Sequence, residues 1–205
     1  MAALKRTNPE PRMELEHGNP LELLVSTILS AQCTDARVNM VTAGLFKKYK
    51  TASDYAEADQ KAFEQEIRST GFYRNKAKNI IAACKIIDER HGGKVPDTTE
   101  GLLELPGVAR KTANIVLTAG FGKVEGIAVD THVMRVSQRL GLTKQKDPNK
   151  IERDLMRQIP RRDWGEVNML MVLFGRYTCT AKRPQCGKCL LNKACPSAFK
   201  VKGWE

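Results

Sequence analysis

Helical spacing of apolar residues runs through almost the whole 205-residue chain, and it limits the possible folds more than any other feature. Apolar side chains recur at the three- and four-residue intervals of an α-helix, and no segment shows the sustained alternation of a half-buried strand. The clearest stripe lies in one long central segment and comprises Ala77, Ile80, Ile81, Cys84 and Ile87. The sequence therefore predicts an all-α fold.

Start and stop signals mark where these helices begin and end. Asp147 and Pro148 read as a cap followed by proline at the first helical position, and Gly92 is expected to stop the long central helix. Asp97 is expected to cap the helix that follows it. The expected helices are 20–30, 35–49, 53–57, 60–70, 73–90, 98–104, 109–119, 131–140, 148–159 and 163–176.

Basic residues outnumber acidic ones, with 34 Lys and Arg against 23 Asp and Glu and a formal net charge of +11. They are spread along the chain, so they do not form a basic tail. This charge suits a polyanion such as nucleic acid, although it would also serve solubility alone. No stretch approaches the roughly 18 uncharged apolar residues of a membrane span, and the start lacks the apolar run of a signal peptide. We expect a soluble cytoplasmic protein, associated with the nucleoid if the source is bacterial.

The length and the 41% apolar content suit one large domain or two small ones. Composition alone does not mark a boundary, because the chain has no low-complexity linker. The weakest connection is "GFGKVEGIAVD", residues 120–130, where three glycines separate two expected helices.

Six cysteines are unevenly distributed. Cys84 lies on the apolar stripe and is expected in the core, whereas four others crowd into "CTAKRPQCGKCLLNKAC" with the spacing C-x6-C-x2-C-x5-C. This spacing predicts a shared metal centre, and zinc and iron–sulfur both remain open because each accepts four thiolates. Two disulfides are the alternative, which a reducing compartment disfavours. The four candidate ligands are Cys179, Cys186, Cys189 and Cys195.

The stretch "ELPGVARKTANIV", residues 104–116, reads as a helix end, a tight turn and a new helix. Gly107 supplies the backbone freedom that the turn needs, and the peptide N–H groups at the start of the new helix are unpaired. Such a helix start attracts anions, including a DNA phosphate. An ordinary helical corner is the alternative, because Pro-Gly turns are common.

Taken together, the hairpin, the segment "AVDTHVMRVSQRLGL" and the cysteine spacing resemble endonuclease III, a DNA glycosylase family of the helix-hairpin-helix superfamily. The stretches "LLVSTILSAQCTDARVN" and "TGFYRNKAKNI" are similar to earlier motifs of the same family. The resemblance spans residues 19–195. In this family the cysteine spacing holds a [4Fe-4S] cluster, so the resemblance favours iron–sulfur over zinc.

The resemblance also implies an architecture. It predicts two helical domains with a DNA cleft between them, a six-helix barrel of residues 13–124 that carries the hairpin and a cluster domain of residues 1–12 plus 125–205. The helix that usually precedes the first motif is expected to be missing or curtailed. The partner implied is double-stranded DNA that contains damaged pyrimidines or abasic sites, bound by a monomer.

The family removes damaged pyrimidines in base excision repair and then cleaves the strand, using a lysine and an aspartate. By motif these are Lys111 in "GVARKTAN" and Asp130 in "VDTHV". A helix start beside Arg110 disfavours the charged form of a lysine nucleophile, and a carboxylate can stabilise positive charge on the sugar. On spacing alone, Lys111 is equally an exposed basic residue and Asp130 the N-cap of the next helix. The implied activity is excision of oxidised pyrimidines such as thymine glycol and dihydrouracil, with β-elimination 3′ to the abasic site.

The resemblance further assigns DNA contacts. Gln32 would enter the gap left by a flipped base and Phe72 would act as a wedge, although by themselves they read as a polar residue at a helix end and a core aromatic. This chain has Ala109 where the family commonly has glycine, and Phe72 where it commonly has leucine, so DNA grip or damage range is expected to differ. The hairpin contacts are Pro106, Gly107, Val108, Ala109 and Arg110.

Three other functions compete with this interpretation. An adenine glycosylase shares the hairpin and cluster, but it lacks the lysine and usually has a further C-terminal domain. A non-catalytic module would use the hairpin only to hold phosphate. An electron carrier would make the cluster its purpose, which the basic charge disfavours.

Overall fold

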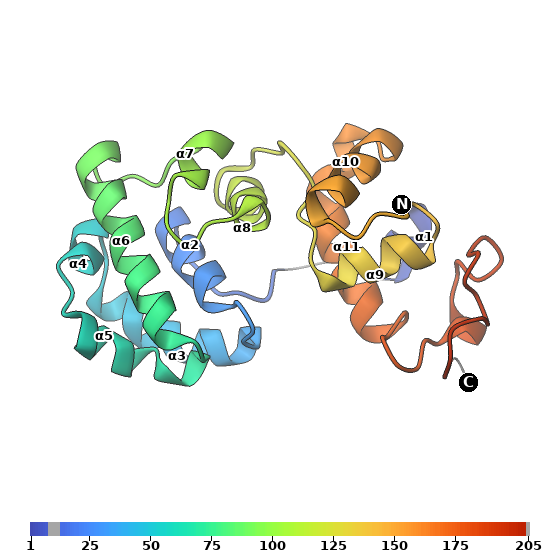
Figure 1. Ribbon diagram of the computed structural model, residues 1–205, viewed down its shortest axis with the longest axis horizontal. Helices are drawn as coiled ribbons and strands as arrows, with labels where there is room; N and C mark the ends of the chain where they lie inside the picture. Colours follow the sequence, from blue (N-terminus) through green and yellow to red (C-terminus); the bar gives the residue numbers. More distant parts are fainter. Residues whose placement is uncertain (8–12, 204–205) are drawn as a thin grey trace. The chain divides into compact units, whose positions relative to one another are not determined.

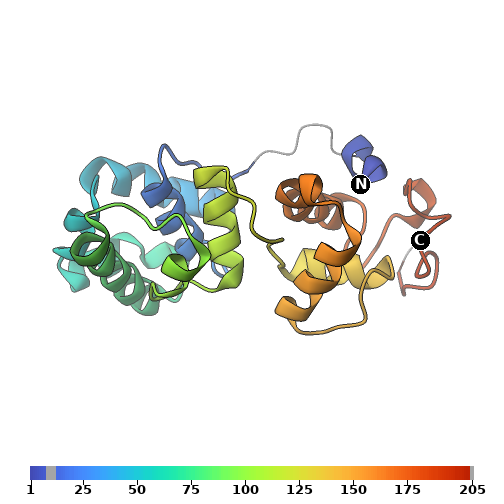
Figure 2. The same ribbon diagram turned by 90° about the horizontal axis from the view of Figure 1, so that it is seen from above.

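The computed structural model describes residues 1–7 and 13–203. By contacts the chain divides into two compact units, residues 13–125 and residues 1–12 with 126–205. All regular structure in the described residues is helical, as Figures 1 and 2 show, and the predicted all-α class is confirmed. None of the described helices is long and apolar enough to cross a membrane.

Residues 13–125 fold around one long helix, α6. This helix packs against α4, α5 and α2, while α8 packs against α7 and α2. The elements of the unit are α2 (Pro20–Leu29), α3 (Asp35–Lys48), α4 (Ala52–Ala56), α5 (Gln60–Glu66), η1 (Arg68–Thr70), α6 (Tyr73–His91), α7 (Thr99–Leu103), α8 (Arg110–Ile115) and the π-helical η2 (Val116–Gly120).

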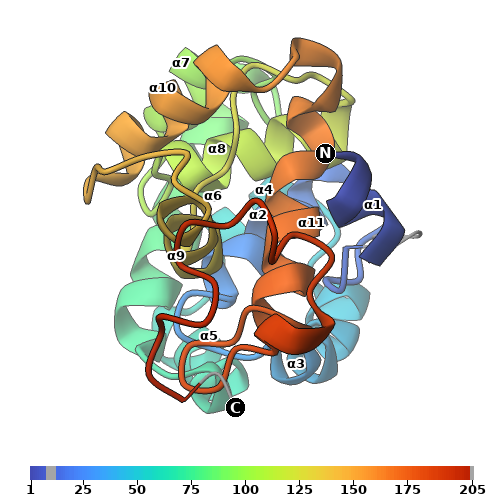
Figure 3. The same cartoon turned by 90° about the vertical axis from the view of Figure 1, so that its right-hand side faces the viewer.

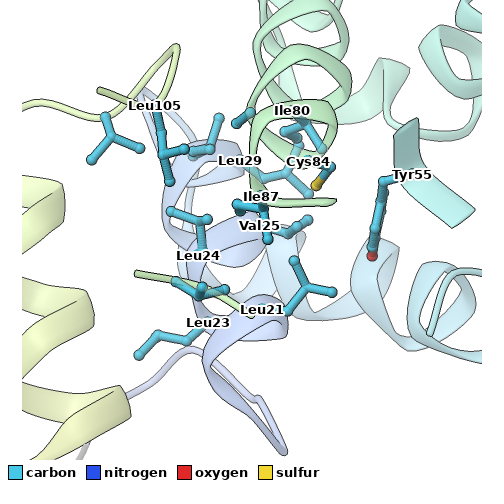
Figure 4. Close-up of a cluster of buried hydrophobic side chains, with 14 of the residues drawn as sticks. Leu21, Leu23, Leu24, Val25, Leu29, Tyr55, Ile80, Cys84, Ile87 and Leu105 are labelled. Atoms are coloured by element: carbon cyan, nitrogen blue, oxygen red, sulfur yellow. The ribbon is translucent and has the colours of Figure 1, made fainter. Parts of the chain in front are cut away.

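The predicted apolar stripe of α6 forms the centre of this unit. Ala77, Ile80, Cys84 and Ile87 are buried, whereas Ile81 is half-buried at the edge. Figure 4 shows the Cys84 thiol among the aliphatic side chains of α2 and α6, as expected for a core cysteine. Burial also raises the pKa of the Cys84 thiol to about 12, so the group stays neutral.

The second unit is built on α11 (Trp164–Tyr177), which packs against α9 (Thr131–Arg139), η3 (Arg161–Asp163) and α1 (Ala2–Thr7). Figure 3 shows α1 lying against α11, where Leu4 is buried. The described residues thus include one amino-terminal helix, α1, packed in this unit. The unit is completed by α10 (Pro148–Gln158) and η4 (Cys186–Lys188).

Most predicted helix ends agree with the structure within a few residues, and Asp147 caps α10 as expected. The prediction for Asp97 is wrong, because Thr98 caps α7 by accepting the Gly101 N–H at 3.3 Å. Asp97 instead pairs with Lys123, which holds the pKa of the Asp97 carboxyl below its usual value. The segment expected as one helix over 109–119 is α-helical only to Ile115, because the backbone then widens into a π turn, a feature often found at functional sites.

Candidate nucleic-acid interface and cysteine pocket

A pocket on the unit of residues 13–125 is lined by two loops and the hairpin turn. Gln32 comes from the loop after α2, Phe72 from the loop before α6, and Gly107 from the turn before α8. The family resemblance assigns all three residues to DNA contacts, and in the structure they line the same pocket. The remaining lining residues are Ile28, Ala31, Asn75, Lys76 and Asn79.

Gln32 and Phe72 both have left-handed backbone, with φ of 54° and 48°. This region is rarely populated by residues with large side chains, and it persists only when the surrounding structure holds it. Phe72 is also 62% exposed, so the reading of this residue as a core aromatic is wrong. An exposed ring on a strained backbone, next to an exposed amide, has the character of a binding site rather than of a core edge.

The charged Lys76 lies beneath these two loops and is only 4% exposed. Its Nζ donates hydrogen bonds to the carbonyl oxygens of Leu29 at 2.7 Å and Thr70 at 2.8 Å. Burial lowers the pKa of the Lys76 ammonium from its ordinary value. Sequence reasoning missed this residue, although its position four residues before Ile80 on the apolar stripe marked it as a lysine on a buried face.

The hairpin turn depends on glycine at one position and not at another. Gly107 has a φ of 81°, and a Cβ there would lie 2.9 Å from Cβ of Asn79. Ala109 is the N-cap residue of α8 and has extended backbone, with φ of −103° and ψ of 172°. Any residue adopts that conformation, so the glycine that the family commonly has at this position is not needed for the turn. Val108 is buried and fixes the turn from below.

Lys111 is exposed in the first turn of α8. The helix keeps its other side, with Ala113 and Asn114, in the interior. Arg110, which precedes Lys111, is half-buried. The basic side chain at position 111 is therefore accessible to a ligand from solvent, and the hairpin fixes the backbone from which it projects.

Asp130 lies in the unit of residues 1–12 and 126–205. Its Oδ1 accepts the Val133 N–H at 2.8 Å, which confirms the predicted N-cap of α9. The preceding segment is held by Asn168, whose side-chain amide donates to the Ala128 carbonyl at 2.8 Å. The half-buried carboxylate thus has one hydrogen-bonding role in the fold and keeps a second oxygen for other chemistry.

The four clustered cysteines line one pocket in the second unit. Each is a free, half-buried thiol, and burial raises the pKa of the Cys189 thiol. Within residues 1–7 and 13–203, no three His, Cys, Asp or Glu side chains are grouped as a single-ion site. The thiols stand around a shared hollow instead. They are Cys179, Cys186, Cys189 and Cys195.

Two hydrogen-bond donors point toward the sulfur atoms of these cysteines. Arg139 donates to the sulfur of Cys179 at 3.4 Å and to the Thr180 carbonyl at 2.7 Å, and the Leu191 N–H lies 3.4 Å from the sulfur of Cys189. Four thiols around one pocket, with N–H groups directed at two of them, form a donor set that fits an iron–sulfur cluster.

The chain matches a known superfamily of DNA repair proteins. Residues 25–161 match the model of the HhH-GPD superfamily base excision DNA repair proteins. Endonuclease III of Synechocystis sp. is 54% identical over 95% of this chain and 89% of the relative. Endonuclease III of Bacillus subtilis is 50% identical over 91% of this chain and 85% of the relative.

Solved structures agree with these relatives. A trapped endonuclease III–DNA covalent intermediate, an estranged-adenine complex, has a TM-score of 0.92 at 46% identity and covers 97% of this chain and 93% of that chain. A non-covalent endonuclease III–DNA complex gives the same values. The chain belongs to the endonuclease III family of the HhH-GPD superfamily.

The hairpin geometry predicts that substitution of its two small residues affects stability differently. Gly107→Ala should lower the free energy of unfolding by about 1–3 kcal/mol, because alanine disfavours this φ and its methyl group meets Asn79. Ala109→Gly should change it by less than about 0.5 kcal/mol, because the backbone is extended and glycine is a good N-cap. Urea unfolding of both variants checks this. Equal losses in the two variants would contradict the expected difference between positions 107 and 109.

Proposed function

We propose that the protein is a bifunctional DNA glycosylase and AP lyase of base excision repair, which excises oxidised pyrimidines of the thymine glycol and dihydrouracil class. The observation that carries this proposal is the gathering of Gln32, Phe72 and Gly107 around one pocket, directly before the helix of Lys111, in an endonuclease III chain. Its partner is double-stranded DNA with a damaged pyrimidine or an abasic site. It acts as a monomer, in the cytoplasm where bacterial DNA lies.

The damaged base must leave the stack before any bond at its sugar can react, and the gap it leaves must be filled. The exposed ring of Phe72 can stack on a neighbouring base, since base–aromatic stacking does not require a particular sequence. The amide of Gln32 offers both donors and an acceptor to the base that lost its partner. Strained backbone at both positions supports a role in which the two side chains are held ready for DNA.

Lys111 supplies the nucleophile in this mechanism. Its neutral amine attacks the sugar C1′, and a new C–N bond forms as the bond to the damaged base breaks. The base leaves with the bonding electron pair and takes up a proton. The C1′–O4′ bond then breaks as the amine nitrogen forms a C=N double bond, and O4′ takes up the proton that Lys111 lost, which gives a Schiff base on the opened sugar. Removal of a C2′ proton then expels the 3′ phosphate by β-elimination. The solved relative captured as a covalent intermediate with DNA supports this route, because a lysine nucleophile passes through such a species.

Asp130 acts on charge and protons in the same reaction. Its carboxylate stabilises the positive charge that develops on the sugar as the base departs, and it accepts the proton that Lys111 must lose. The cap hydrogen bond that the Val133 N–H donates to Asp130 supports this role, since it orients the carboxylate.

The four clustered cysteines hold a [4Fe-4S] cluster in this proposal. When bound, the cluster ties four points of the loop to one centre and so fixes its path. Arg139 and the Leu191 N–H would donate to the thiolate sulfurs and stabilise their charge. An ordered loop presents its exposed cations to the phosphate backbone, and these are Lys182, Arg183, Lys188 and Lys193.

Borohydride trapping tests the nucleophile. The wild-type protein should form a covalent adduct with a thymine glycol duplex, and Lys111→Ala should form none while base release falls by about a hundredfold or more. Lys85→Ala, which removes an exposed lysine of α6, serves as the matched control and should trap normally. An adduct with Lys111→Ala, or turnover by wild type without any adduct, would overturn the lyase mechanism.

Two substitutions at Asp130 separate its roles. Asp130→Asn keeps a good N-cap but removes the charge, so we expect wild-type stability with single-turnover base release about a hundredfold lower. Asp130→Ala should lose a similar amount of activity and also about 1 kcal/mol of stability. Thermal unfolding and excision kinetics of both variants measure this. Full activity in Asp130→Asn would reduce the residue to a helix cap.

Metal analysis tests the cluster. The purified protein should contain iron and acid-labile sulfide in equal amounts, and Cys189→Ala should lose both and bind duplex DNA more weakly, because its basic loop is no longer fixed. Cys84→Ala removes a thiol of the other unit and should keep its iron. Zinc in place of iron, or unchanged iron in Cys189→Ala, would count against the proposed ligand set.

A further inference from the structure

Lys76 is an unusual residue for the position it occupies. It lies in the first turns of α6, next to the buried Ala77 and four residues before the buried Ile80, and is itself 4% exposed. Removing an ammonium group from water costs several kcal/mol unless its hydrogen bonds are replaced. An unbranched apolar side chain would fill the same space without that penalty. The reason for a lysine here must therefore lie in the groups that it contacts.

Those groups are two backbone carbonyls at helix ends. Leu29 is the last residue of α2 and Thr70 the last residue of η1, where carbonyls have no partner within the helix. The Lys76 ammonium donates to both, at 2.7 Å and 2.8 Å, across sequence separations of 47 and 6 residues. One positive charge therefore joins two helix ends that are distant in the chain.

Each of these ends leads directly into a strained residue. The chain runs from Leu29 to Gln32 in three residues and from Thr70 to Phe72 in two. Gln32 and Phe72 are the non-glycine residues with left-handed backbone that line the pocket. Their φ values need outside support to persist, and the two bonds of Lys76 supply a fixed point just before each.

The same face of α6 supports the hairpin as well. Asn79 follows Lys76 by three residues, so the two side chains are neighbours on the helix surface. A Cβ at Gly107 would lie 2.9 Å from Cβ of Asn79, which shows that the turn rests directly on this side chain. Lys76 and Asn79 line the pocket together with the loops that they support.

We propose that Lys76 is a positioning residue that sets the Gln32 loop and the Phe72 loop in one register, so that both side chains enter damaged DNA together. This inference rests on the proposed function, because it assigns the two loops to the gap left by the flipped base. Lys76 itself touches neither DNA nor the reacting atoms.

The first test compares two substrates. Lys76→Met keeps an unbranched side chain of similar length but loses both hydrogen bonds, so excision from a thymine glycol duplex should fall about ten- to a hundredfold. β-Elimination at an abasic site in single-stranded DNA requires no gap to be filled and should stay within about twofold of wild type. Lys78→Met removes an exposed lysine of the same helix and should change neither reaction. Equal losses on both substrates would show general damage and overturn the proposal.

A double-mutant cycle then shows through which residues Lys76 acts. In a Gln32→Ala, Phe72→Ala background, adding Lys76→Met should reduce duplex excision by no more than about twofold, because the side chains that it positions are gone. Multiplication of the separate effects would overturn the proposal. Should Lys76→Met fail to fold, Lys76→Gln, which keeps two N–H donors on a shorter arm, goes through the same cycle with the same criteria.

A readout without turnover keeps this inference distinct from the proposed function. A duplex with 2-aminopurine opposite a tetrahydrofuran abasic analogue should change its fluorescence when wild type or Lys78→Met fills the gap. Lys76→Met should bind this duplex with the change largely lost. Absence of any base release by wild type would overturn the proposed glycosylase activity alone, whereas an unchanged fluorescence response in Lys76→Met would overturn the role of Lys76.

Discussion

Burial of the apolar face of α6 is the interaction on which the rest of residues 13–125 depends. Ala77, Ile80, Cys84 and Ile87 lie along it without solvent contact, and α2, α4 and α5 pack around it. Figure 4 shows how closely the side chains of α2 meet those of α6. Because this packing holds the helix in place, the first turns of α6 give rigid support to the loops beside them.

The two loops that carry Gln32 and Phe72 are supported by these first turns of α6. Phe72 is the residue immediately before α6, and Gln32 follows α2, the helix that packs on it. Left-handed backbone at both positions costs on the order of 1–3 kcal/mol each, which a loop without support would release by relaxing. The core offsets this cost only because Lys76 and Asn79 connect it to the loops and to the hairpin turn. The packed core thus keeps the surface residues Gln32 and Phe72 in defined backbone conformations.

Local pattern predicted the helices well, because periodicity and caps are encoded over a few neighbouring residues. Asp147 and Asp130 cap their helices as their spacing indicated, and the cysteine spacing led to one pocket. The exposure of Phe72 was harder to predict from the sequence, since an aromatic residue next to a helix start is ordinarily buried. Only the tertiary structure shows that this side chain is exposed. The role of Lys76 depends on a carbonyl 47 residues away, and no local signal carries such a contact. Asp97, which precedes the cap residue Thr98, pairs instead with the distant Lys123, a contact that local sequence likewise does not encode.

Two residues depart from the pattern common in the family, and the structure separates their consequences. Alanine at position 109 replaces glycine where the backbone is extended, so the hairpin keeps its shape and only a methyl group is added at an exposed site. Phenylalanine at position 72 replaces leucine at the tip of a strained and exposed loop, where the side chain itself is the proposed DNA contact. A ring stacks on bases in a way that a leucine does not. Any difference in damage range from relatives should therefore originate at Phe72, on the side of the helix that Lys76 holds.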